Sequence, residues 1–279
     1  MSAPRSPSRR RLLRGAVAGA VASLAGGAAV VRSNRLDVRA VAEPGSAPGA
    51  GEPLRVALVT DMHAPHDWFA FSELAAATRA FDPHLVLIAG DAINRRGDEG
   101  LVRAYDALPA RLGKFAALGN WEYQGLCDIV RLRAEYEAAG VRLLINEEAT
   151  VDHGGERLRV VGLDDFLHGR PFMDVVASSS RTAAAADAPR TLLMAHCPEL
   201  FDHAARHTTA PFTAFAGHTH GGQIAPFGVA LVTPPGSGRY VKGWYGAGRQ
   251  RLYVSRGLGN SDIPFRIGSP PELALLTLE

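Results

Sequence analysis

The sequence of 279 residues has little cysteine, and several familiar motifs are missing. Cys127 and Cys197 are the only thiols, which excludes a disulfide scaffold or a metal site built from several thiolates. We expect two separate buried thiols, with a single bridge as the alternative in an oxidising compartment. The sequence G-x-S-x-G does not occur, so nothing indicates a serine nucleophile on an elbow. No repeat of fixed period occurs either, which argues against a solenoid.

Most of the chain also lacks a basic excess. The formal net charge is +2, but residues 1–42 hold eight Arg and one Asp, a net +7, which leaves −5 for residues 43–279. A body of this sign lacks the general positive field of a nonspecific nucleic-acid-binding protein, although a local patch stays open. We therefore expect no specific nucleic-acid binding.

The N-terminal segment has the layout of a twin-arginine export signal. Ser8-Arg9-Arg10-Arg11 precedes an uncharged, small-residue run from Gly15 to Val31, which is typical of such signals. The alternatives are a basic tail or a membrane tether through residues 15–31, although this run is rich in Gly and Ala and spans poorly compared with about 20 strongly apolar residues. Ala40-Val41-Ala42 has the form of a cleavage site but lies well beyond the run, so retention of the leader stays open. The predicted location is the periplasm or the outer face of the cytoplasmic membrane, reached through the twin-arginine export machinery.

The rest of the chain is expected to form one domain. Residues 43–53, rich in Ala, Gly and Pro, predict a linker between the leader at 1–42 and a folded domain at 54–279. Apolar runs and helical periodicities then alternate, which indicates parallel strands with crossover helices. We expect strands at 54–60, 84–89 and 114–118, and helices at 68–80, 97–111 and 126–139.

The second half adds a different pattern. Gly154-Gly155 separates two β-like segments, which predicts a two-residue hairpin. A strand, a helix and a strand follow through residues 190–216, and three β-like segments are expected near 228–233, 251–256 and 272–278. The residues alone therefore indicate the α/β class.

Five apolar runs each end close to a residue that binds divalent metals. These residues are Asp61, Asp91, Asn120, His196 and His218. The carboxyl ends of strands in open α/β sheets form the ligand edge, so these side chains are expected to converge there. His63 and His220 lie two residues from members of this set.

The types of these residues predict the kind of metal. Two Asp, one Asn and four His offer oxygen and nitrogen without sulfur, which suits Mn, Fe, Co or Zn. Seven side chains exceed the about four to six ligands of one ion, which predicts two divalent ions that share a carboxylate, with Asp91 as the natural bridge. Two ions about 3.5 to 4 Å apart can clamp the attacking and leaving oxygens of a phosphoryl transfer and supply hydroxide between them.

These motifs give the chain a resemblance to the calcineurin-like metallophosphoesterases over residues 54–279. The resemblance rests on D-x-H at Asp61, G-D at Asp91, G-N at Asn120, H at His196 and G-H-T-H-G-G-Q-I at 217–224; S-R-G-L-G at 255–259 and P-P-E at 270–272 resemble the exported bacterial branch with a twin-arginine leader. It implies a four-layer αββα sandwich, with two mixed sheets, helices outside and the site at its top edge. It also implies a pairing of ligands: Asp61, His63, Asp91 and His220 on one ion, and Asp91, Asn120, His196 and His218 on the other.

One position departs from the family pattern. The family usually has G-N-H-[DE], whereas this chain has Trp121 after Gly119-Asn120. The resemblance implies that the missing His lies beside the phosphate and helps to protonate the leaving group, which an indole cannot do. His66 is the candidate substitute; a leaving group of low pKa and weak activity are the alternatives.

The predicted function is therefore a metal-dependent hydrolase of phosphomonoesters or phosphodiesters, acting on a small phosphoester or a phospholipid-type substrate. Arg256 and Arg266 are candidates to bind the substrate phosphate by a bidentate fork, with a structural ion pair as the alternative. The second hypothesis is a weakly catalytic metalloprotein that binds a phosphorylated lipid or polymer of the cell envelope.

Overall fold

A computed structural model describes residues 35–45, 51–64, 71–94, 98–177, 190–261 and 263–279. The twin-arginine motif, the run at 15–31 and His66 lie outside these residues. Within the described part of the chain, none of the helices has the length and hydropathy needed to cross a bilayer.

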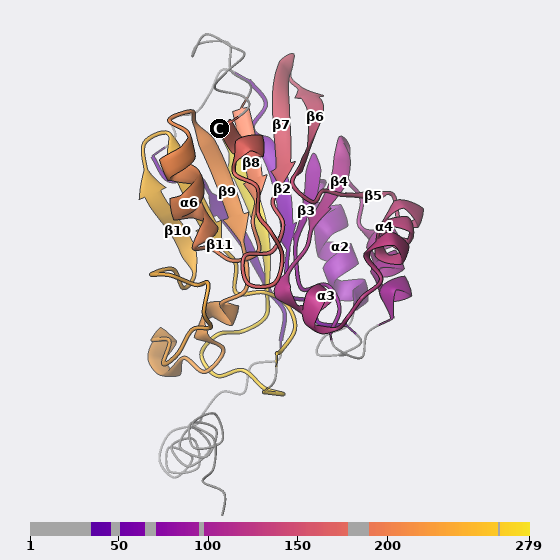
Figure 1. Cartoon of the computed structure of the whole chain (residues 1–279), viewed down its shortest axis with the longest axis vertical. Coiled ribbons are helices and arrows are strands. Elements are labelled where there is room, and N and C mark those ends of the chain that lie inside the picture. Colours follow the sequence, from indigo (N-terminus) through magenta and orange to yellow (C-terminus); the bar gives the residue numbers. More distant parts are fainter. Residues whose placement is uncertain (1–34, 46–50, 65–70, 95–97, 178–189, 262) are drawn as a thin grey trace, which may run out of the picture. The chain divides into compact units, whose positions relative to one another are not determined.

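Two six-stranded mixed sheets form the centre of the domain (Figure 1). The order in the first sheet is β1-β12-β2-β3-β4-β5, in which β2 to β5 are parallel to one another and β12 runs antiparallel to β2. Its strands are β1 (Asp37–Ala42), β12 (Glu272–Leu278), β2 (Leu54–Val59), β3 (Leu85–Ala89), β4 (Gly113–Ala117) and β5 (Val141–Leu143).

The second sheet has the order β10-β11-β9-β8-β7-β6. Its four central strands are parallel, and β10 and β6 are antiparallel at the two edges. Its strands are β10 (Gly243–Ala247), β11 (Gln250–Val254), β9 (Phe212–Ala216), β8 (Arg190–Met194), β7 (Glu156–Gly162) and β6 (Glu147–His153).

Alternation along the strands creates the layers. In β2, Val56 and Leu58 belong to the core between the two sheets, whereas Ala57 and Val59 pack in the core that holds the helices α2 (Phe71–Phe81), η1 (Glu99–Ala107) and α4 (Ile129–Ala138). In the second sheet, Leu193 packs in a third core with α6 (Leu200–His207). Because side chains of a strand alternate between faces, each sheet is covered on both sides. The predicted four-layer αββα fold is confirmed.

The predicted N-terminal boundary of the domain, at residue 54, is wrong. Asp37–Ala42, which we expected in the leader, forms β1 and pairs along its length with Glu272–Thr277 of β12. The signal was weak because an edge strand exposes most of its side chains, as β1 does. The sheet therefore begins N-terminal to Leu54, and Ala40-Val41-Ala42 lies inside a strand.

Several other elements differ from the expectation. Residues 97–111 contain the 3₁₀ helix η1, capped by the Asp98 carboxylate, rather than an α-helix. Residues 228–233 do not form a strand, and it is β10 that pairs with β11 at this edge of the sheet. The hairpin at Gly154-Gly155 is confirmed, and both glycines have the positive φ that a tight turn requires.

Candidate metal centre

The seven predicted ligands are buried at one edge of the two sheets. Asp61, Asp91 and Asn120 follow β2, β3 and β4, and His196 and His218 follow β8 and β9, each two or three residues after the strand ends. His220 begins the short helix η2 (His220–Gly222). The parallel strands therefore deliver polar side chains from both sheets to one place, as the sequence pattern predicted.

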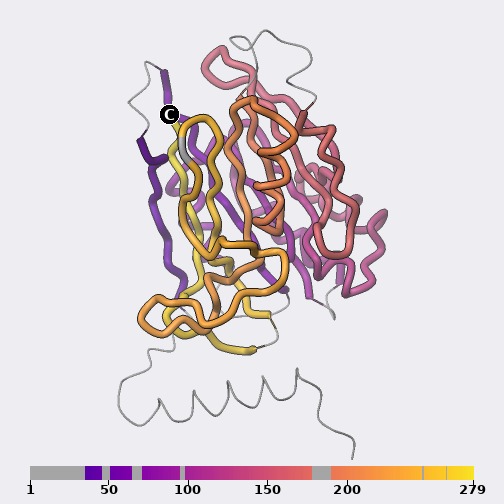
Figure 2. Tube along the Cα trace, turned by 60° about the vertical axis from the view of Figure 1, so that its left-hand side comes forward, coloured from indigo at the N-terminus to yellow at the C-terminus, as the bar shows by residue number. Residues whose placement is uncertain are grey.

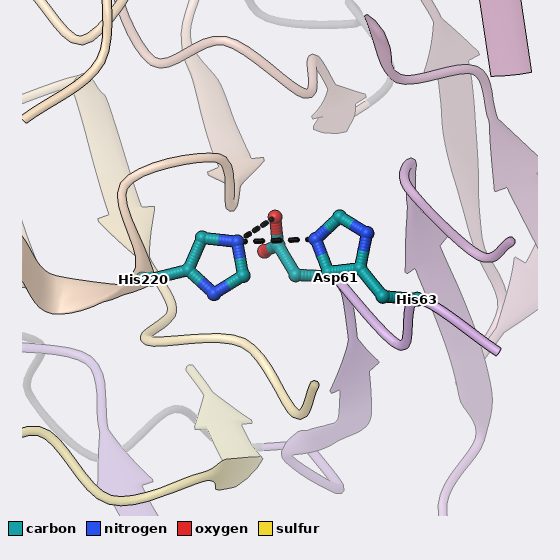
Figure 3. A group of neighbouring side chains, drawn as sticks. All are labelled: Asp61, His63 and His220. Carbon is teal, nitrogen blue, oxygen red and sulfur yellow. Dashed lines mark hydrogen bonds and ion pairs between the residues drawn. The ribbon is translucent and has the colours of Figure 1, made fainter. Parts of the chain in front are cut away.

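One group consists of Asp61, His63 and His220 (Figure 3), whose potential ligand atoms lie within 4.8 Å of one another. Nε2 of His63 is 3.1 Å from Nε2 of His220, and the latter is 3.5 Å from Oδ1 of Asp61. Two imidazole nitrogens and a carboxylate that face one space form a donor set typical of transition-metal sites.

The other group consists of Asp91, His196 and His218, again within 4.8 Å. Nε2 of His196 is 3.2 Å from Nδ1 of His218 and 3.2 Å from Oδ2 of Asp91. The same Oδ2 is 3.7 Å from Nε2 of His63, in the first group. Asp91 therefore lies between the two groups.

Asn120 provides an independent test of whether cations fit. Among the described residues, its buried Oδ1 accepts no hydrogen bond. Such an oxygen carries a desolvation cost of about 1–3 kcal/mol, and coordination of a cation would offset it. The oxygen, the two donor sets and the absence of sulfur all fit divalent metals.

Backbone carbonyls fix the orientation of two of the imidazoles. Nδ1 of His196 donates to the carbonyl of Ala89 at 2.8 Å, and Nε2 of His218 donates to the carbonyl of Pro235 at 2.7 Å. A carbonyl only accepts, so the opposite nitrogen of each ring has the lone pair whenever that ring is neutral, as it must be to bind a metal. Such outward bonds usually orient metal-binding histidines.

The first group is held differently. Nδ1 of His63 has no hydrogen-bond partner among the described residues, and Nδ1 of His220 lies 2.9 Å from Nη2 of Arg266. A guanidinium only donates, so His220 accepts through Nδ1 in this arrangement and its neutral ring carries the proton on Nε2. A cation held by Nε2 would require this contact with Arg266 to be given up.

Five of the predicted ligands have left-handed backbone conformations. Their φ angles lie between 50° and 70°, and the residues are Asp61, His63, Asp91, His218 and His220. Such a conformation costs about 1–3 kcal/mol per residue and persists only where the surroundings enforce it. Backbone bonds do so here: His63 N donates to Asp91 O at 3.0 Å, and Gly259 N donates to Asp61 O at 2.6 Å.

Close approach requires glycine at two of the strand ends. A Cβ on Gly217 would lie 2.2 Å from Oδ2 of Asp61, and a Cβ on Gly119 would lie 2.3 Å from Oδ1 of Asp91. These contacts are far shorter than van der Waals separation, so both carboxylates pack directly against backbone. The glycines before two predicted ligands, His218 and Asn120, therefore make room for the carboxylates of Asp61 and Asp91.

Glu122 is a site residue that the sequence reasoning missed. Its buried carboxylate accepts from the backbone N of Gly119 and of Ala92 at 2.8 Å each, and from that of Asp91 at 3.1 Å. It thereby joins the loops after β3 and β4. Burial and the charge of Asp91 raise its pKa to about 7. The acidic position of the G-N-x-[DE] pattern was the available signal.

The four imidazoles do not share one charge state, because His196 differs from the other three. Burial lowers the pKa of His63, His218 and His220, which keeps them neutral. Burial acts in the same direction on His196, but the adjacent charge of Asp91 outweighs it and raises this pKa to about 10. A cation in this group would replace a proton, since metal-bound imidazole is unprotonated.

Trp121 lies next to the first group. Its half-buried ring meets His63 edge-on, with 5.1 Å between ring centroids, and its backbone N donates to Oδ1 of Asp91 at 2.8 Å. The indole does not titrate, so it supplies a flat wall and no acid. His66, the candidate substitute, lies outside the described residues.

The two arginines that we expected to bind phosphate are both engaged by other residues of the protein. Arg256 is buried and pairs with Glu272 and, at 2.6 Å, with Asp37. Arg266 is fully buried and donates to the carbonyls of Gly259 and Arg256 as well as to His220. Their donors are engaged inside the fold, so we correct their role to a structural one.

The two cysteines are separate. Both are free, Cys197 is buried and Cys127 is partly so, which confirms the absence of a bridge. The described part of the chain brings no thiol into either candidate group.

Comparisons with known proteins agree with this geometry. A family model described as calcineurin-like phosphoesterase matches residues 54–222. The chain is 28% identical over 242 residues to the uncharacterized metallophosphoesterase YkuE of Bacillus subtilis (strain 168), covering 83% of this chain and 81% of YkuE. It is also 28% identical over 243 residues to the uncharacterized metallophosphoesterase Cj0846 of Campylobacter jejuni, covering 83% of this chain and 61% of that protein. NAD nucleotidase (NadN) of Haemophilus influenzae shares the fold, with a TM-score of 0.51 at 14% identity over 75% of this chain and 46% of that one.

Proposed function

We propose that the two ligand groups bind two divalent cations for the hydrolysis of phosphate mono- or diesters, because the chain belongs to the calcineurin-like phosphoesterase family. It is a hydrolase of phosphoester bonds. The observation that carries the proposal is the position of Asp91 Oδ2, within 3.7 Å of a histidine nitrogen from each group. A shared carboxylate is the arrangement that couples two cations.

The proposed ligands divide between the groups. Asp61, His63 and His220 hold one cation, Asn120, His196 and His218 hold the other, and Asp91 is shared. Their oxygen and nitrogen donors suit Mn, Fe, Co or Zn. When bound, such ions polarise phosphoryl oxygens and make water acidic enough to supply a nucleophile near neutral pH.

The surrounding residues set what the site accepts. Glu122 fixes the loops that present Asp91 and Asn120, and Trp121 forms an uncharged wall beside His63. Since the indole gives no proton, we propose that the natural leaving group needs little protonation, as in a phosphoanhydride or a phosphodiester of an acidic alcohol.

Turnover of an aryl phosphodiester tests the function. The purified chain, loaded with Mn²⁺, is expected to cleave bis(p-nitrophenyl) phosphate, and Asp91→Asn is expected to abolish the activity. Removal of the metal by a chelator and its return should switch the wild-type rate off and on. A rate that survives both treatments would contradict a metal-dependent mechanism.

The identity of Trp121 favours a second candidate function. Without a proton donor, the centre would bind a phosphorylated lipid or polymer of the envelope and turn it over poorly. Two bound metals with no turnover of aryl or alkyl phosphoesters would favour this candidate. In the hydrolase, Trp121→His should raise the rate on alkyl esters; an unchanged rate would show that the missing imidazole does not limit it.

We propose further that the protein is exported, to the periplasm or the outer face of the cytoplasmic membrane. The support is the sequence Ser8-Arg9-Arg10-Arg11 with the apolar run behind it, and the fact that folded export would keep metals acquired in the cytoplasm. Replacement of Arg9 and Arg10 by lysine should hold the protein in the cytoplasmic fraction. An unchanged distribution would overturn the proposal.

A further inference from the structure

A loop beside the metal centre exposes large apolar side chains. Residues 226–232 contain Phe227, Val229, Leu231 and Val232, which are 96%, 66%, 57% and 63% exposed. The loop, coloured orange, extends beyond the sheets at the lower left of Figures 1 and 2. Scattered exposed apolar residues are ordinary, but a cluster on one short loop indicates an interaction surface.

The backbone holds this loop in place. Phe227 has the left-handed φ of 54°, and the bonds from Gly228 N to Ala225 O at 2.9 Å and from Val229 N to Pro226 O at 3.1 Å close tight turns around it. Ala225 N is itself bonded to Ile267 O at 2.7 Å. A bulky residue in this conformation is unusual, so the outward position of Phe227 is built into the fold.

The loop is joined directly to the ligand groups. Gly222, in the helix that begins with His220, packs so closely on the loop that a Cβ there would lie 2.3 Å from Cβ of Ala230. After the loop, the carbonyl of Pro235 accepts from Nε2 of His218. Whatever the loop contacts is therefore brought next to the metal centre.

One basic side chain contacts the loop, and a second lies near it. Nζ of Lys242 donates to the carbonyl of Gly228 at 2.9 Å, and Arg39 of β1 is close enough to act on Lys242 electrostatically. Glu272, the acid that acts on Lys242, is itself paired with Arg256. Apolar tips above cations match a bilayer, with acyl chains inside and anionic headgroups at the surface.

We propose that residues 226–232 dock on a bilayer containing anionic phospholipid, and that the substrate is a phosphate ester carried by a lipid at that surface. The second part rests on the proposed function. A second copy of the chain fits the loop less well, because a stable dimer interface needs about 20–30 residues from each side. A lipid surface needs only a few inserted apolar residues next to cations.

A spin label tests the docking without any turnover. Leu231→Cys, in a Cys127→Ser and Cys197→Ala background, carries a nitroxide, and Val130→Cys is the matched control. Val130 is 82% exposed on α4, in the helix layer over the other sheet. On addition of phosphatidylglycerol vesicles, the label at 231 should lose at least about half of its accessibility to an aqueous relaxation agent, while the label at 130 should not.

Each other result counts against the proposal. Accessibility that does not change at 231 overturns the docking. Protection without vesicles, together with a doubled mass in solution, assigns the loop to a second copy. Equal protection by vesicles of phosphatidylcholine, which has no net charge, would show that Lys242 and Arg39 do not attract anionic headgroups. Because the label is local, binding of vesicles by residues 15–31 does not affect the comparison.

Turnover separates the substrate class from the activity itself. Phe227→Asp combined with Leu231→Asp should lower hydrolysis of vesicle-borne phosphatidic acid by about tenfold or more and leave bis(p-nitrophenyl) phosphate unaffected. An equal loss on both substrates, or no loss on either, contradicts the lipid assignment. If the wild-type chain cleaves neither substrate, the proposed function fails, whereas the spin-label result still decides the docking.

Discussion

The metal centre buries polar side chains, whereas the loop at residues 226–232 exposes apolar ones. Both are the reverse of the usual distribution between core and surface. The centre buries two carboxylates, an amide and four imidazoles in partly strained backbone. The loop exposes four large apolar side chains to solvent. Both arrangements cost stability, and both lie at the same end of the sandwich, joined through Gly222 and Pro235.

These two places are where the fold departs from the most stable arrangement of its residues. Elsewhere in the described sheets, alternate residues fill three apolar cores in the ordinary way. Residues that lower the stability of the fold are expected at functional sites. Substitutions that restore ordinary chemistry at either place should therefore remove function while leaving the fold intact or more stable.

Loss of the shared carboxylate should have the largest effect. Asp91→Asn removes the oxygen that lies between the groups, so turnover should fall by more than the roughly 100-fold that loss of an outer-shell partner costs. Elemental analysis should find fewer than two metals per chain, with the conserved fold verified by circular dichroism. Two tightly bound metals in this variant would contradict the bridging position.

Glu122→Gln should weaken metal binding by about 10- to 100-fold, the range for groups that orient ligands. The neutral amide keeps one oxygen but loses the charge-assisted bonds to the loops after β3 and β4. Metal titration of the variant gives the shift. Glu147→Gln, at a partly exposed ion pair with Arg133, is the control and should bind as the wild type does; equal behaviour of the two variants would remove the positioning role of Glu122.

A smaller and opposite effect is expected at Asn120. Asn120→Leu removes the buried oxygen that accepts no hydrogen bond from any described residue, so the metal-free protein should gain about 1 kcal/mol in free energy of unfolding. Metal occupancy should fall at the same time. Urea unfolding of both proteins without metal measures the difference, and a destabilised variant would show that the oxygen is not a cost in the empty site.

The smallest effect on stability belongs to the loop. Phe227→Ala should change the free energy of unfolding by no more than about 0.5 kcal/mol, as for other surface substitutions. Phe215→Ala, at a fully buried phenylalanine between the sheets, should cost about 3–5 kcal/mol. Comparable losses at the two positions would mean that Phe227 packs against the protein in solution.

The metal centre was easier to predict from the sequence than the contacts around it. Polar residues after apolar runs, at Asp61 or Asp91, are visible because strand ends converge in any parallel sheet. The αββα layers came from the resemblance and are confirmed. Predictions were wrong where pairing between distant segments matters. Strand β1 pairs with β12, more than 200 residues later in the chain, and the strand that pairs with β11 is β10 rather than residues 228–233.

The roles of Glu122, Arg256 and Arg266 depended on such contacts as well. The arginines looked available for phosphate. Arg256, however, pairs with Asp37, which is 219 residues away in the sequence, and Arg266 donates to the backbone carbonyl of Gly259, which carries no side-chain signal. The carbonyl of Pro235 that orients His218 is 17 residues away and carries no side-chain signal. The local pattern predicted which side chains gather at this edge of the sheets, but not the contacts that hold them there.

Anomalous diffraction from crystals grown with Mn²⁺ tests the two-cation centre most directly. The predicted result is two peaks, one at Asp61, His63 and His220 and one at Asn120, His196 and His218, with the Asp91 carboxylate between them. No peak at this edge of the sheets, or a single peak that Asp91→Asn leaves in place, would contradict it.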